Sequence, residues 1–71
     1  MYPNLLGQKA YYHLSNDDMA KIIGVNRSTY EAKIKNGRFV VSECLAYCRY
    51  FQKDFEFLFA VERGLTPNRT A

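Results

Sequence analysis

The sequence predicts an all-α protein, a compact bundle of five short helices. Apolar residues recur at helical spacing along most of the 71-residue chain, which is 48% hydrophobic and 15% aromatic. Turn-forming residues, among them Gly24 and the pair Asn36-Gly37, divide this pattern into short segments. The one run that resembles a strand, Phe39-Val40-Val41, has no plausible partner strand. The segments are therefore expected to pack on one another as helices around one core.

The first two helices are expected to run from Pro3 to about Tyr12 and from Asn16 to Ile23. Pro3 suits an early helical position. Ser15 is a good N-cap for the second helix, because Asp18 stands three residues on and can complete a capping box. The residues expected to face the core are Leu5, Leu6, Ala10 and one or both of Tyr11 and Tyr12 in the first helix, and Met19, Ala20 and Ile23 in the second.

Gly24 is expected to end the second helix, because glycine enters the left-handed backbone region cheaply at a helix C-terminus. A third helix should then start at Asn26 or Arg27 and run to about Lys35, before the Asn36-Gly37 turn. The residues expected to be buried here are Val25, at the corner between the two helices, and Tyr30 and Ile34 in the third helix.

Two further helices are expected after this turn. Ser42 is expected to cap a fourth helix that runs through Phe51, and Asp54 to start a fifth helix that Gly64 ends. Residues 1–64 would then form the domain and residues 65–71 a flexible C-terminal tail. The core positions expected in these helices are Cys44, Leu45, Cys48 and Phe51 in the fourth, and Phe55, Leu58 and Phe59 in the fifth.

The composition offers little for metal binding or catalysis. Cys44 and Cys48 lie four apart in a helical segment, where both side chains point the same way, so reduced core thiols are expected rather than a disulfide. His13 is the only histidine, and a zinc site would need more ligands. His13 and the scattered acids do not assemble a nucleophile, a base and a pocket. We therefore expect no enzyme, metal, cofactor or small-molecule ligand.

Other classes are excluded on similar grounds. No stretch approaches the roughly 20 apolar residues that a membrane span needs, and no signal-peptide pattern opens the sequence, so a cytoplasmic protein with no membrane partner is expected. The eleven Tyr and Phe residues stand at helical spacing beside Leu and Cys, which favours core packing. They are not expected to serve as stacking platforms for single-stranded nucleic acid.

Positive charge is concentrated in one part of the chain. Residues 21–40 hold five bases against one acid, whereas residues 1–20 carry a net charge of −1 and residues 41–71 are balanced. The total of +3 is small, but its position indicates where an anionic partner would bind.

The segment "MAKIIGVNRSTYEAKI" resembles the two-helix core of the lambda-repressor and Cro-type helix-turn-helix family, many of whose members come from phages. An eight-residue helix, a glycine turn and a helix starting three residues later match that unit. The similarity extends to "SECLAYCRYFQKDFEFLF" and covers roughly Leu5 to Phe59. The chain departs from the pattern at His13, where glycine is common, at the large Tyr30, and in a segment from Ile34 to Gly37 that is one residue longer. The family's pattern is carried by Met19, Ala20, Gly24, Val25, the trio Asn26-Arg27-Ser28, and Tyr30.

The resemblance implies a sequence-specific double-stranded DNA-binding transcription regulator, expected to be a repressor, that reads the major groove with the third helix. Arg27 suits a guanine edge, Glu31 could accept from cytosine or repel wrong registers, and Ala32 leaves room for a thymine methyl group. The base-reading positions that the resemblance implies are Asn26, Arg27, Ser28, Glu31 and Ala32. The positions expected to contact phosphates are Asn16, Lys33, Lys35, Asn36 and Arg38.

A weak homodimer is expected, because two half-sites give more selectivity than one recognition helix. Phe57 and Val61, four apart, would lie on a side of the fifth helix away from the core and form the dimer interface, unless they pack against the first helix of their own chain. Two other functions stay open. The chain could be a helix-turn-helix-fold protein-interaction module of a phage or bacterium with no DNA target, or an antitoxin or plasmid regulator of the same fold.

Overall fold

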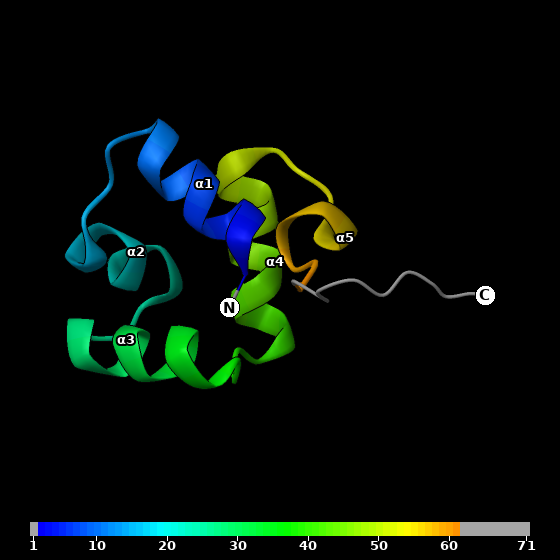
Figure 1. Cartoon of the computed structure of the whole chain (residues 1–71). Helices are drawn as coiled ribbons and strands as arrows, with labels where there is room; N and C mark the ends of the chain where they lie inside the picture. The colour runs from blue at the N-terminus through cyan, green and yellow to red at the C-terminus, as the bar shows by residue number, and fades with distance from the viewer. Residues whose placement is uncertain (1, 62–71) are drawn as a thin grey trace.

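The fold is built from five helices that follow one another through short connections (Figure 1). A computed structural model describes residues 2–61 of the chain, and no strand occurs among them. The prediction of a compact, all-helical chain is therefore confirmed over this range. The helices are α1 (Pro3–Tyr11), α2 (Asn16–Ile23), α3 (Arg27–Asn36), α4 (Val41–Phe51) and α5 (Phe55–Leu58).

Two sets of contacts hold the helices together. α2 packs against both α3 and α4, while α5 packs against both α1 and α4. In Figure 1, α2 and α3 lie together on the left, and α4 runs behind the centre of the molecule. None of the helices in residues 2–61 has the length and apolar character needed to cross a bilayer.

The residues that begin α2, end α2 and begin α3 are the ones the sequence predicted. Ser15 Oγ accepts from the backbone N–H of Asp18 at 3.0 Å, and Asp18 Oδ2 accepts from the Ser15 N–H at 2.9 Å. Gly24 has φ = 75°, in the left-handed region that favours glycine. Asn26 then caps α3 by accepting from the Thr29 N–H at 2.8 Å. The start and end of α2 and the start of α3 are thus set by local chemistry.

The predicted end of α4 at Phe51 is confirmed, whereas the predicted start of α4 and the predicted end of α5 are wrong. α4 is capped at Val40 and not at Ser42, because Glu43 Oε1 accepts from the Val40 N–H at 3.0 Å and supplies the cap from inside the helix. α5 ends at Leu58, after four residues. Gly64, expected to end it, and the expected tail 65–71 lie outside the described residues.

The core differs from the prediction in α1, α4 and α5. Leu45 is exposed, and Tyr47 is buried in its place, because its hydroxyl donates to the Met19 carbonyl at 2.9 Å and fixes the rotation of α4. Leu6, Ala10, Tyr11, Tyr12 and Phe55, also expected to face the core, are exposed. The buried apolar residues are Leu5, Met19, Ala20, Tyr30, Cys44, Tyr47, Phe51 and Leu58.

Aromatic rings form the centre of this core around Phe39. Its ring centroid lies 5.6 Å from that of Tyr47 and 6.0 Å from that of Phe59. The ring centroids of Tyr2 and Tyr30 lie 6.1 and 6.4 Å away. The expectation of core packing is confirmed for these rings and for Phe51, and is wrong for the exposed rings of Tyr11, Tyr12, Tyr50 and Phe55. Phe57 is exposed, as its expected position away from the core requires.

Within residues 2–61, two residues other than glycine adopt left-handed backbone conformations. His13, between α1 and α2, has φ = 58°, and Gln52, which ends α4, has φ = 57°. The turn between α1 and α2 therefore places a histidine in a conformation that glycine adopts at lower cost. Each such conformation costs free energy because the Cβ atom crowds the backbone.

Candidate nucleic-acid interface

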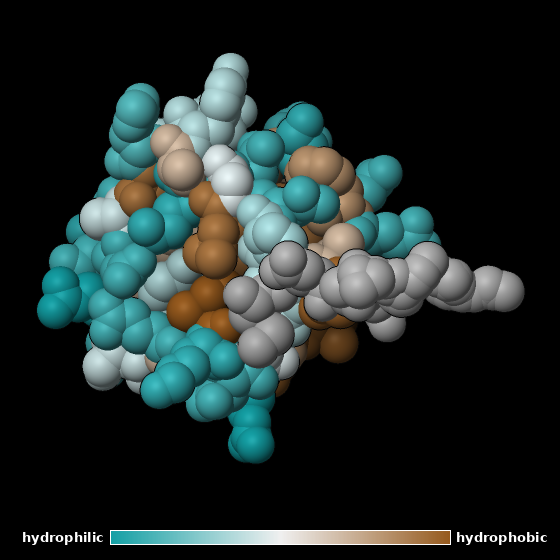
Figure 2. All heavy atoms as spheres, in the orientation of Figure 1, coloured by the Kyte–Doolittle hydropathy of each residue, from teal (hydrophilic) through white to brown (hydrophobic). Residues whose placement is uncertain are grey.

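α3 has one buried side and one exposed side. Tyr30 is buried and Ile34 packs partly against the core, so these two residues anchor the helix. Ser28, Ala32 and Lys35, at i, i+4 and i+7, lie on the opposite, exposed side. Figure 2 shows a mainly hydrophilic surface on the left of the molecule, where α2 and α3 lie. An elongated polar surface of this kind is what a DNA groove would meet.

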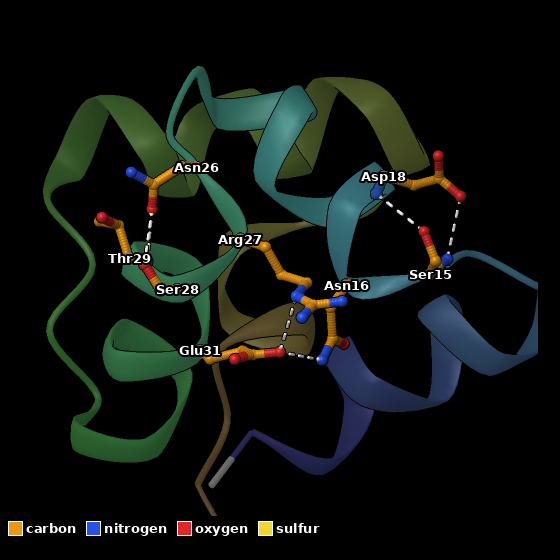
Figure 3. Close-up of polar contacts among 8 residues, drawn as sticks. All are labelled: Ser15, Asn16, Asp18, Asn26, Arg27, Ser28, Thr29 and Glu31. Atoms are coloured by element: carbon orange, nitrogen blue, oxygen red, sulfur yellow. Dashed lines mark hydrogen bonds and ion pairs between the residues drawn. The ribbon is translucent and has the colours of Figure 1, made fainter.

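At the N-terminal end of α3, three predicted site residues are joined through one carboxylate (Figure 3). Glu31 Oε2 accepts from Asn16 Nδ2 at 2.8 Å and lies 3.5 Å from Arg27 Nε. The side chains of Arg27 and Glu31 are 61% and 45% exposed. Asn16 is the first residue of α2, so the contact also connects α2 with α3.

Two of the predicted base readers also form the cap of α3. Asn26 Oδ1 accepts from the Thr29 N–H and, at 3.0 Å, from Ser28 Oγ (Figure 3). The oxygen of the Asn26 side chain is therefore committed to the helix. Its amide N–H groups and the lone pairs of the Ser28 hydroxyl are the parts that could contact a base.

The predicted phosphate-binding residues occupy different environments. Lys33 Nζ lies 3.2 Å from Glu43 Oε1, with the two side chains only 19% and 12% exposed, and it also donates to the Arg38 carbonyl at 3.5 Å. Lys33 therefore joins α3 to α4, a role that its position in the sequence did not reveal. Lys35, Asn36 and Arg38 are exposed. A shallow hollow of about 350 Å³ is lined by Ser28, Thr29, Ala32, Lys33, Asn36 and Arg38.

Asp18, Cys44 and Cys48 are ionisable groups with shifted pKa values. Hydrogen bonds from Ser15 lower the pKa of Asp18, which keeps a negative charge at the positive end of α2. Burial raises the pKa of the Cys44 and Cys48 thiols, both free, so they stay protonated at neutral pH. Within residues 2–61, no group of three or more His, Cys, Asp or Glu side chains could hold a metal ion.

The predicted dimer residues are exposed, but they do not share a helix. Phe57 is 42% exposed and Val61 41% exposed. Val61 lies beyond the end of α5, so the expected helical spacing of four is wrong. The Phe57 carbonyl accepts from Asn4 Nδ2 at 2.8 Å, and Lys53 Nζ lies 5.8 Å from the Phe57 ring centroid. α1 thus contacts the Phe57 backbone while much of the ring remains accessible.

The ten predicted DNA-contacting residues are distributed around one unit. They lie on α3, at its N-cap Asn26, at the first residue of α2, and on the segment that follows α3. A search of protein-family models, curated proteins and solved structures found no match to this chain.

Proposed function

We propose that the chain is a sequence-specific, double-stranded DNA-binding transcription regulator of the lambda-repressor-like helix-turn-helix type, acting as a repressor. The observation that carries this proposal is the α2–Gly24–α3 unit, in which Tyr30 is buried while the opposite side of α3 is exposed and polar. Proteins of this type place the second helix of the unit in the major groove, with its N-terminal residues against base edges.

In such a complex, each exposed residue of α3 meets a suitable group. Arg27 donates to guanine O6 and N7, and Ala32 accommodates a thymine methyl group. The N-terminus of α2 presents Asn16 and backbone N–H groups to a phosphate. Lys35 and Arg38 neutralise phosphates beside the groove. Lys33 contributes less, because Glu43 already neutralises its charge.

The test is selection of bound duplexes from a random pool at about 0.15 M salt, near physiological ionic strength. The parent protein should enrich one motif. Arg27→Ala should bind that motif about 5- to 150-fold more weakly, equivalent to about 1–3 kcal/mol, and should lose the preference at one base position. Arg49→Ala, which removes an exposed arginine from α4, is the matched control and should keep the motif. If Arg27→Ala selects the parent motif with undiminished affinity, α3 is not the reading helix.

We further propose that the active species is a weak homodimer, formed through Phe57 and Val61 and completed on two half-sites. Phe57 lies in α5 and Val61 three residues beyond its end, and both are partly exposed. Sedimentation of the protein at tens of micromolar, with and without the selected duplex, measures the stoichiometry. A protein that is monomeric without DNA, and that binds the selected duplex as a single chain at a single half-site, would refute the dimer.

Exposed apolar residues support a second candidate, a protein-interaction module with the same fold and no DNA target. Val41 and Leu45 on α4 and Phe55 on α5 are all exposed. Such a module would carry apolar residues on its binding helix, whereas α3 exposes polar and charged ones. We therefore favour DNA. A protein that enriches no duplex in the selection, at any salt concentration, would support the interaction module.

A further inference from the structure

We propose that Glu31 is a specificity-determining residue: it positions Arg27 and selects cytosine in the base pair next to the guanine that Arg27 reads. The inference rests on the proposed function, since it assumes that α3 lies in the major groove. It adds to that function the proposal that two neighbouring bases are read by one set of connected side chains, those of Asn16, Arg27 and Glu31.

The geometry places both contacts on the same carboxylate oxygen. Glu31 Oε2 accepts from Asn16 Nδ2 at 2.8 Å and lies 3.5 Å from Arg27 Nε (Figure 3). Arg27 Nε is at the base of the guanidinium group, so this contact leaves the two terminal nitrogens to face a base edge. Oε1, the second carboxylate oxygen of Glu31, likewise keeps its lone pairs for a further donor.

Holding Arg27 in place matters more for binding than for the fold. The pair Arg27–Glu31 is largely exposed, and an exposed pair of this kind adds little to stability. A long arginine side chain normally loses much rotational freedom when it binds a base. Because Glu31 restrains it beforehand, and Asn16 restrains Glu31, less of that freedom is lost on binding.

The chemistry of a carboxylate then points to cytosine. An ionised carboxylate only accepts hydrogen bonds, and the major-groove edges of guanine and thymine offer it acceptors that repel it. Adenine offers its N6 amino group beside the acceptor N7, which also repels a carboxylate. Cytosine offers its N4 amino group without an acceptor of its own on that edge. Glu31 Oε1 is therefore matched to cytosine.

The experiment repeats the random-pool selection with Glu31→Gln, Glu31→Ala and the control Glu56→Gln, which removes an exposed acid from α5. The parent should select guanine and, in a neighbouring base pair, cytosine. Glu31→Gln should replace cytosine by adenine, because a carboxamide can contact both N6 and N7, and should keep the guanine. Glu31→Ala should reduce the preference for cytosine over the other bases at that position about tenfold. Glu56→Gln should select the parent motif.

Asn16→Ala tests the positioning separately, because it leaves the net charge unchanged. We expect it to broaden the base frequencies at both the guanine and the cytosine positions. An Asn16 that only contacts a phosphate would instead weaken all duplexes equally, and that result would overturn the positioning role. Circular dichroism of each variant checks that it is folded.

Two results separate the inference from the function on which it rests. If Glu31→Gln binds all duplexes more tightly and leaves every base frequency unchanged, Glu31 acts only through its charge, and the inference fails while DNA reading stands. If the parent itself enriches no motif, the proposed function fails and this inference falls with it.

Discussion

Tyr30 and Tyr47 are both buried, yet their replacement by phenylalanine should have opposite effects on stability. Tyr47 Oη donates to the Met19 carbonyl at 2.9 Å. Tyr30 Oη is buried without a hydrogen-bond partner among residues 2–61. One substitution therefore removes a hydrogen bond, whereas the other removes a polar atom that gains nothing from being buried.

The magnitudes follow from the general cost of such groups. A buried intramolecular hydrogen bond contributes about 1 kcal/mol, so Tyr47→Phe should lower the free energy of unfolding by about that amount. An unsatisfied buried polar group costs about 1–3 kcal/mol. Tyr30→Phe removes that cost but also some packing contacts, so we expect a net stabilisation of about 1 kcal/mol. In a chain of this size, 1 kcal/mol shifts Tm by about 4–8 °C.

Thermal and urea unfolding at pH 7, followed by far-ultraviolet circular dichroism, measure both changes. Tyr50→Phe is the matched control, because this tyrosine on α4 is exposed and its variant should lie within about 0.5 kcal/mol of the parent. Should Tyr30→Phe prove less stable than the parent by 1 kcal/mol or more, its hydroxyl is hydrogen-bonded in solution and the reasoning is refuted.

The same two phenols predict how stability changes in alkali. Burial, with a smaller contribution from nearby charges, raises the pKa of both tyrosines above their ordinary value of 10.0. Above pH 10 the unfolded chain releases these protons while the folded chain retains them, so the two tyrosines should lower the free energy of unfolding only above about pH 10. The Cys44 and Cys48 thiols, whose pKa values burial raises from 9.0, should begin this fall near pH 9. Tyr30→Phe should make this fall less steep.

Two further predictions concern the end of α4 and the segment around α3. Gln52→Gly should raise the free energy of unfolding by about 0.5–1 kcal/mol, because glycine relieves the strain of the left-handed conformation at φ = 57°. Thermal unfolding measures this change. A Gln52→Ala variant that is stabilised by the same amount would contradict the explanation. Lys35→Ala or Arg38→Ala should weaken binding to all duplexes similarly and should reduce the slope of log affinity against log salt concentration by about one unit. A loss of affinity confined to one sequence would instead make the residue a base reader.

The elements that could be predicted from sequence are those fixed by neighbouring residues. The Ser15 cap with Asp18 and the left-handed Gly24 each depend on a few residues of local chain, and both are found as expected. The rotation of α4 could not be predicted this way. It depends on the bond between Tyr47 and Met19, 28 residues apart, and this bond buries the tyrosine where the pattern favoured Leu45.

The candidate site shows the same division. Which residues of α3 are exposed follows from the spacing of Tyr30 and Ile34. The contact of Asn16 with Glu31 could not be read from the sequence, because it depends on how closely α2 and α3 approach. The pairing of Lys33 with Glu43 could not be predicted for a similar reason, because it depends on how closely α3 and α4 approach. The cap that Glu43 forms at Val40 did have a signal in the sequence, namely an acid three residues after Val40.

The two-sided character of α3 also bears on how a protein of this kind could change during evolution. Tyr30 and Ile34 attach the helix to the core, while Ser28, Ala32 and Lys35 face outward. Substitutions at the three outward positions should be nearly neutral for folding. If α3 reads DNA as proposed, a lineage could therefore move from one DNA binding sequence to another without passing through unstable intermediates. The same separation makes these positions the natural ones to randomise when a new recognition sequence is to be engineered.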